Sequence, residues 1–188
     1  KAYWEFETAP ITQSKVSLRS EYVKLDKIAA VIPVTEEILD DAAGLAAYLS
    51  RRAPGAIGDA LNDALVRGTG VGQPLGILNS PALITQAAEG GQTVDTIVGP
   101  NVAKMLARLP ASSFGSAVWL IHPDALSQLP GLTLNDASLF TQSANMPSGA
   151  VGLMLGRPVI PHQVCATVGD VGDIMLVDMT QYLAAIKV

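Results

Sequence analysis

The residues best suited to chemistry in this 188-residue chain are two histidines and one cysteine. His122 or His162 could act as the base of a dispersed Ser-His-Asp unit, but no G-x-S-x-G nucleophile elbow accompanies either residue. His162 and Cys165 form a single H-x-x-C pair, whereas a structural zinc site usually needs four ligands, and the sequence offers no other two. No basic residue stands near Cys165 in sequence to activate its thiol. We therefore predict no catalytic residue, cofactor or metal, and we expect His122, which precedes Pro-Asp, to cap a helix or lie in a loop.

Glycines and paired carboxylates offer two further possibilities. The run Gly68-Thr69-Gly70-Val71-Gly72 could suggest a nucleotide-binding loop, but such a loop must follow a strand and open a helix. Here the glycines close a helical pattern, so we interpret them as a helix cap followed by a turn. The pairs Glu36-Glu37 and Asp40-Asp41 lie at the start of that pattern. Negative charge there interacts favourably with the helix dipole, and adjacent residues on a helix do not face each other, so we interpret the pairs as stabilising the helix rather than as acid–base catalysts.

Composition and charge narrow the class of protein. Hydrophobic residues make up 49% of the chain and charged residues only 15%, with a net charge of −5. A disordered chain is excluded, and some apolar surface is expected to be buried against neighbouring molecules. Binding nucleic-acid phosphates requires clustered lysine and arginine, and Arg51-Arg52 is the only short basic cluster, so sequence-specific nucleic-acid binding is not expected. No apolar run is long enough to suggest a membrane span, and both chain ends look truncated.

The first part of the chain predicts a hairpin followed by a long helix. Tyr3–Thr8 and Val16–Tyr22 alternate apolar and polar residues, as strands do, but they carry too little apolar surface to fold alone. From Leu45 to Leu65 the apolar residues follow the helical period. Pro54-Gly55 lies in the middle of this stretch, and a kink or break is predicted there.

The remainder predicts an α+β lobe of short helices and strands. Helices are predicted at Pro100–Leu109 and Pro123–Leu129, and an irregular loop over Leu132–Gly152. The predicted strands are Ala117–Ile121, Leu153–Pro161, Ile174–Val177 and Tyr182–Val188.

Three motifs resemble the major capsid proteins of tailed bacteriophages, which have the Hong Kong 97-type fold. The acidic turn VTEEILDD begins at Val34, the glycine-rich turn GQPLGIL covers Gly72–Leu78, and GRPVIP covers Gly156–Pro161. The resemblance implies an α+β fold in three parts. These are an extended-loop hairpin and return strand over residues 1–33, the spine helix and glycine-rich turn of a partial peripheral domain over 34–77, and a mixed α+β axial domain over 78–188.

The resemblance also implies a function. It implies a major capsid subunit that self-assembles through pentamers and hexamers into an icosahedral phage or prophage shell enclosing DNA. Such a subunit would belong to the virion capsid and assemble in the host cytoplasm, with scaffolding, portal or decoration proteins as further partners. An encapsulin-type nanocompartment is the near alternative, and a small cytosolic α/β hydrolase using His122 or His162 is the alternative from another class. The residues expected at subunit interfaces are Trp4, Phe6, Arg19, Tyr22, Arg51, Arg52, Asn135 and Phe140.

Overall fold

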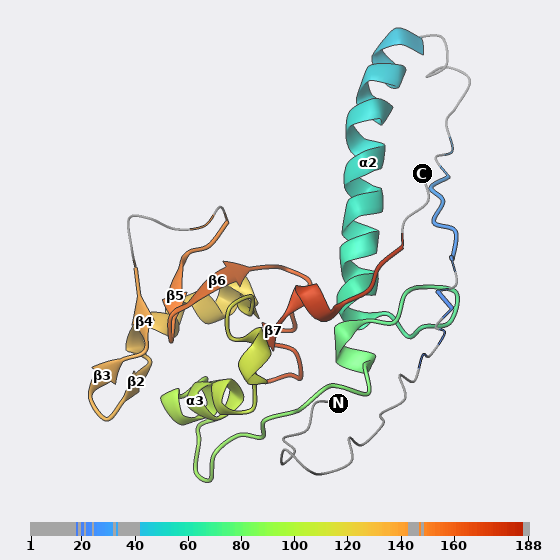
Figure 1. Ribbon diagram of the computed structural model, residues 1–188. Coiled ribbons are helices and arrows are strands. Elements are labelled where there is room, and N and C mark those ends of the chain that lie inside the picture. The colour runs from blue at the N-terminus through green and yellow to red at the C-terminus, as the bar shows by residue number, and fades with distance from the viewer. Residues whose placement is uncertain are drawn as a thin grey trace, which may run out of the picture.

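The computed structural model describes residues 18, 20, 22–23, 25–31, 33, 42–142, 147 and 149–185. A long helix, α2 (Ala42–Arg67), rises from one side of a body built around a five-stranded sheet (Figure 1). The chain leaves the lower end of α2 and builds the body. The C-terminal end of the chain then returns to the side of α2. The predicted order, a long helix followed by a lobe of short helices and strands, is therefore confirmed in the described residues.

The sheet of the body is mixed, with strand order β4-β5-β6-β1-β7. β1 and β6 pair in parallel, and the other neighbours pair antiparallel. At the centre, Trp119 of β1 lies opposite Val159 on one side and Leu176 on the other. The strands of this sheet are β1 (Val118–Ile121), β4 (Phe140–Thr141), β5 (Gly152–Met154), β6 (Arg157–Pro161) and β7 (Ile174–Val177), while β2 (Thr133–Leu134) and β3 (Ala137–Ser138) form a separate hairpin.

Apolar side chains cover both faces of β1, because successive residues of a strand point to opposite sides of the sheet. Trp119 and Ile121 belong to the larger buried cluster, whereas Val118 and Leu120 pack against the smaller one. Trp119 is fully buried, and its Nε1 donates a hydrogen bond to the carbonyl oxygen of Met154 at 3.0 Å. The indole therefore fills the core without leaving a polar atom unpaired.

Short helices connect the strands. The helix α3 (Gly99–Ala107) confirms the helix predicted at Pro100–Leu109, and its Val102 is buried in the larger cluster. The second predicted helix, Pro123–Leu129, is a 3₁₀ helix, η3 (Pro123–Ser127), rather than an α-helix. The other 3₁₀ helices are η1 (Ile77–Asn79), η2 (Ala111–Ser113), η4 (Leu129–Gly131) and η5 (Met179–Gln181).

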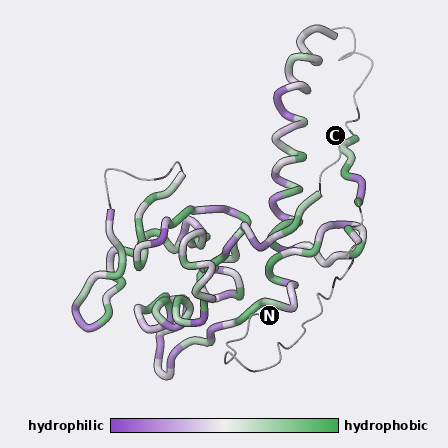
Figure 2. The backbone as a smooth tube through the Cα atoms, viewed as in Figure 1, coloured by the Kyte–Doolittle hydropathy of each residue, from purple (hydrophilic) through white to green (hydrophobic). Residues whose placement is uncertain are grey.

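The helix α2 runs through Pro54 without a break, so the predicted break is wrong, while the alternative of a kink stays a prediction. Proline removes only one main-chain donor, and the 26-residue helix continues on both sides of that position. Polar and apolar residues are interspersed along α2 (Figure 2). The acidic start predicted at Val34–Asp41 lies outside the described residues. No helix in the described part of the chain is both long and apolar enough to cross a membrane.

Several predicted strands differ from those observed. Leu153–Pro161 is not one strand but a hairpin of β5 and β6, which turns at Leu155-Gly156 with positive φ at both residues. The predicted loop Leu132–Gly152 contains the β2–β3 hairpin and β4. Residues 182–185 lie in no strand, and 186–188 are outside the described part. The predicted strand Tyr3–Thr8 is also outside it, and the described residues of Val16–Tyr22 lie in no strand.

Candidate assembly surfaces

The turn after α2 sets how the helix stands on the body. Gly76 N–H donates to the Gly68 carbonyl at 2.8 Å, so the turn folds back onto the end of the helix. A Cβ atom on Gly68 would lie 2.0 Å from the carbonyl oxygen of Pro74, and a Cβ on Gly76 would lie 2.5 Å from the Gly68 nitrogen. Only glycine permits so close an approach of main chain to main chain. The predicted helix cap and turn are confirmed, since the glycines close a helix, whereas a phosphate-binding loop opens one.

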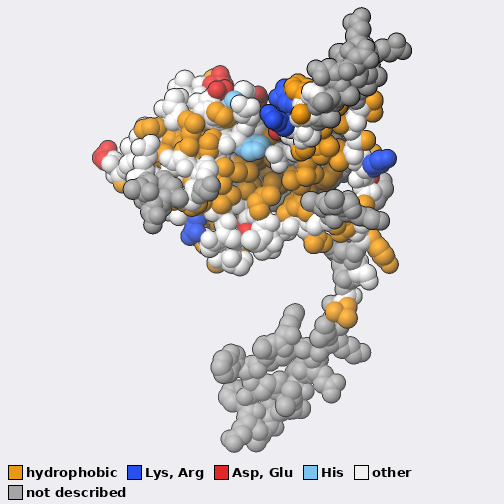
Figure 3. Space-filling view, turned by 90° about the horizontal axis from the view of Figure 1, so that it is seen from above, with side chains coloured by type: hydrophobic (Ala, Val, Ile, Leu, Met, Phe, Trp, Pro, Cys, Tyr) orange, Lys and Arg blue, Asp and Glu red, His pale blue; other side chains and the backbone are white. Residues whose placement is uncertain are grey.

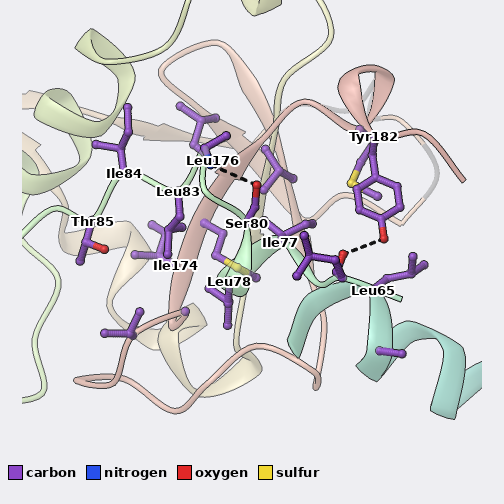
Figure 4. Close-up of a pocket in the computed structure, with 18 of the residues that line it drawn as sticks. Leu65, Ile77, Leu78, Ser80, Leu83, Ile84, Thr85, Ile174, Leu176 and Tyr182 are labelled. Carbon is purple, nitrogen blue, oxygen red and sulfur yellow. Dashed lines mark hydrogen bonds between the residues drawn. The ribbon is translucent and has the colours of Figure 1, made fainter. Parts of the chain in front are cut away.

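Two polar side chains tie this turn to the rest of the chain. Asn79 Nδ2 donates to the carbonyl oxygens of Arg67 and Gly68 at 2.8 and 3.0 Å, and so satisfies carbonyls at the end of α2. Tyr182 Oη donates to the carbonyl oxygen of Leu75 at 2.9 Å, and this bond holds the returning C-terminal segment against the turn (Figure 4). The C-terminal end of α2 is therefore held by hydrogen bonds within the turn that follows it, and this turn is held by a hydrogen bond from the C-terminal segment.

The β2–β3 hairpin presents a small polar tip. Its two turn residues, Asn135 and Asp136, both have positive φ, at 49° and 63°. Two central residues with positive φ, joined directly by paired strands, define a type I′ turn, which asparagine and aspartate favour. Both side chains are exposed. Asn135, predicted as an interface residue, is thus placed at an accessible tip.

The remaining residues predicted at interfaces fall in different places. Tyr22 is 97% exposed, and Arg51 and Arg52 are exposed on α2. Phe140 is half-buried and packs against the larger cluster, where its ring fills the space that a side chain on Gly152 would need. Phe140 therefore supports its own subunit. The other three residues, Trp4, Phe6 and Arg19, lie outside the described residues.

A large apolar groove lies between α2, the loop after η1, and β7. Its volume is about 1830 Å³. Figure 4 shows Leu65 of α2, Leu83 and Ile84 of the loop, and Ile174 and Leu176 of β7 turned toward this space. The space-filling view also shows apolar side chains gathered over the body beside α2 (Figure 3). Sequence reasoning did not find this groove, because its walls come from several distant stretches, which include residues 22–28 and 182–185.

The residues suited to chemistry have structural roles. His122 caps η3, since its Nδ1 accepts a hydrogen bond from the Asp124 N–H at 3.3 Å, which confirms the predicted cap. His162 Nδ1 accepts from the Val164 N–H at 3.2 Å. Burial raises the pKa of the Cys165 thiol to about 11, which disfavours the reactive thiolate. The described residues contain no cluster of histidine, cysteine and carboxylate side chains that could hold a metal ion.

Comparison with known proteins defines the class. Residues 1–187 match the phage capsid family, and the chain belongs to that family. This membership supports a structural role in a capsid shell, and neither the hydrolase nor the encapsulin alternative is favoured. A comparison with curated proteins finds no significant match.

Solved capsid structures share the fold. One is the capsid of an empty GTA particle computed with C5 symmetry, with a TM-score of 0.61 and 19% identity over 95% of this chain and 64% of that chain. Another is the capsid of a native GTA particle, also computed with C5 symmetry, with a TM-score of 0.53 and 19% identity over 77% of this chain and 52% of that chain. The chain therefore spans less than two thirds of the length of these capsid chains.

Proposed function

We propose that the chain forms most of a major capsid subunit of the Hong Kong 97 type, which self-assembles into an icosahedral shell enclosing DNA. The observation that carries the proposal is the family match over residues 1–187. The architecture supports it, because a long helix stands on an α+β body as in a spine helix joined to an axial domain. An exposed turn and an open apolar groove suit a protein whose partners are neighbouring subunits.

The three parts of the proposed subunit follow the predicted boundaries. Residues 1–33 form the extended loop and return strand, 34–77 the spine helix and its glycine-rich turn, and 78–188 the axial domain. In this arrangement the Asn135-Asp136 tip of the axial domain approaches the symmetry axes, and Arg51 and Arg52 on α2 face a neighbouring subunit. Trp4, Phe6, Arg19 and Tyr22 belong to the extended loop, and Phe140 supports the axial loop from within.

The proposed partners are further copies of the chain, in pentamers and hexamers, together with scaffolding, portal or decoration proteins. The net charge of −5 argues against tight, sequence-specific contact with the enclosed DNA. The proposed location is the virion, after assembly in the host cytoplasm.

Electron microscopy of the full-length protein expressed alone tests this function. Closed shells or capsomer rings with five or six subunits are expected. A protein that stays monomeric in sedimentation velocity runs at high concentration, with and without crowding agents, would contradict the proposal.

A further inference from the structure

The side of α2 that faces away from the groove carries a stripe of exposed residues. A helix turns by about 100° per residue, so residues three or four apart share a face. The stripe has this spacing and consists of Tyr48, Arg52, Gly55, Ala56, Asp59 and Asp63, all of them exposed. On the opposite side of α2, Ile57, Leu61 and Leu65 line the groove. The described residues of 22–28 and 182–185 line the groove too, so these parts of the chain lie on the other side of α2 from the stripe.

The polar side chains of the stripe are available to another molecule. Tyr48 is 59% exposed. Within the part of the chain that the structure describes, the side chains of Arg52, Asp59 and Asp63 form neither an ion pair nor a hydrogen bond. Arg52 and Asp59 stand about 10 Å apart along the helix, so they are not neighbours of the kind that pair within one helix. The upper turns of α2 also stand clear of the sheet of the body (Figure 1).

The order of residues along the stripe is complementary to the same order read backwards. Two helices related by a two-fold axis run antiparallel, and each residue meets its counterpart at the same distance on the other side of the centre. With the centre between Gly55 and Ala56, Arg52 of each copy lies opposite Asp59 of the other. Tyr48 of each copy lies opposite Asp63 of the other, and a phenol hydroxyl donates well to a carboxylate. No two like charges face each other in this pairing.

The centre of the stripe suits a close approach of two helices. Gly55 and Ala56 carry the smallest side chains, and the distance between packed helices depends on the side chains at the contact. A Cβ atom on Gly55 would have no atom within 4 Å in the described chain, so this stretch of α2 is open. Small residues in the middle and charges of both signs on either side are what a symmetric helix pair requires.

We propose that α2 binds α2 of a second copy in antiparallel orientation through this stripe. The inference rests on the proposed shell function, which supplies identical neighbours. A second copy is the occupant because the stripe complements itself, which a segment of the same chain or an unrelated partner has no need to match. Such an isologous contact joins only two subunits, so it links one ring to another rather than closing a ring. One helix pair is a small interface, and its strength in a shell comes from repetition.

Charge reversal in the full-length protein tests this pairing. Arg52→Glu and Asp59→Arg each place like charges opposite each other, so each variant alone should give at least tenfold fewer particles than the unmodified protein. A mixture of the two variants should recover the yield, because both facing pairs then combine opposite charges. Only a contact between copies predicts this rescue, since a contact within one chain is not repaired by another chain.

The matched control is another charge reversal on the same helix. Arg51 is exposed and adjacent to Arg52, but it lies about 90° around the helix from the middle of the stripe. Arg51→Glu mixed with Asp59→Arg should therefore recover no yield. Recovery in this control mixture would show that the rescue does not depend on the stripe, and it would overturn the inference.

Cysteine cross-linking gives a readout that leaves every charge in place. Ala56 lies beside the proposed two-fold axis, so Ala56→Cys should form a disulfide between copies in oxidised particles, seen as a dimer on a non-reducing gel. Asn62→Cys is the control, because Asn62 is exposed on α2 but lies about 20 Å along the helices from its counterpart in this pairing. The natural Cys165 is only 2% exposed, so it does not interfere.

The outcomes separate this inference from the shell function. Rescue by mixing, together with a cross-link at position 56 and none at position 62, supports the helix pair. Normal assembly of the single variants, failure of their mixture to recover, or no cross-link at position 56 in intact particles would overturn the helix pair and leave the shell function standing. Failure of the unmodified protein to self-associate would overturn both proposals.

Discussion

The hydroxyl of Tyr182 donates a hydrogen bond to the carbonyl oxygen of Leu75 at 2.9 Å, and so joins two segments that lie 107 residues apart in sequence. Leu75 belongs to the turn after α2, and Tyr182 follows η5 in the returning C-terminal segment. The helix base and the end of the body are thus bound to each other, as well as through the chain between them.

Removing this bond should weaken the subunit. Tyr182→Phe deletes the hydroxyl and leaves the ring, and the expected loss is about 1 kcal/mol of unfolding free energy, the usual net value of one hydrogen bond. Tyr48→Phe is the control, because Tyr48 is 59% exposed on α2. Urea denaturation measures both, and equal stability of the two variants would show that the bond contributes nothing.

Adding a methyl group to the turn after α2 should lower the free energy of unfolding by more than the loss of the Tyr182 hydrogen bond does. In Gly76→Ala the new Cβ would lie 2.5–2.7 Å from main-chain atoms of Gly68, Val66 and Arg67, so the backbone itself must move. We expect a loss of about 2 kcal/mol, typical of overpacking. Gly55→Ala makes the same change within α2 with no atom inside 4 Å, and it should stabilise the helix by up to about 1 kcal/mol. Thermal unfolding compares the two, and a neutral Gly76→Ala would contradict the close approach.

The buried thiol should make stability fall at high pH. Burial raises the pKa of Cys165 from 9.0 to about 11, so the folded chain holds this proton more tightly than the unfolded chain. The stability from Cys165 is therefore fully present below pH 9 and is lost as the pH rises toward 11. Denaturation of the chain and of Cys165→Ala at several alkaline pH values isolates this contribution, since tyrosine and lysine titrate equally in both. In native protein at pH 8, Cys165 should also react slowly with a thiol reagent, and rapid labelling would refute its burial.

Ionised Asp178 should stabilise the folded chain, and this stabilisation should be lost in the acid range. The nearby hydroxyl of Ser113, and next the hydrogen bonds from Thr180, hold the pKa of Asp178 well below its usual range. Thr180 donates to Asp178 Oδ1 from its hydroxyl at 2.7 Å and from its N–H at 3.1 Å. A lowered pKa means that the stabilisation is present above about pH 4 and is lost as the pH falls further. Asp178→Asn should therefore be less stable than the unmodified chain at pH 7, with a smaller loss on acidification. Parallel acid-denaturation curves for the two proteins would contradict this.

The sequence predicts best those elements whose signals are local. β7 has the predicted bounds because four apolar residues, Ile174–Val177, stand between aspartates. The β5–β6 turn was missed although Gly156 marks it, because its other residue, Leu155, takes a positive φ that bulky side chains rarely adopt. At Pro54 the local signal for a break was strong, but α2 continues through it.

The features of the candidate surfaces also differ in whether a local sequence signal predicts them. The cap formed by His122 could be predicted, because Pro-Asp follows it directly in sequence. The groove could not, because Leu61, Ile84 and Leu176 come together only through the turn after α2 and the sheet order. No periodicity within one segment marks residues that meet in this way.

The turn at the base of α2 also has a mechanical consequence. A helix of 26 residues is a lever about 39 Å long, so a tilt of about 5° at its base would displace its far end by about 3 Å. The fulcrum of this lever is built from main-chain atoms of Gly68 and Gly76, which the side chains of Asn79 and Tyr182 tie to the rest of the chain. The exposed surface of α2 can therefore change its residues freely during evolution, to suit new neighbours, while the angle at which it is presented stays the same.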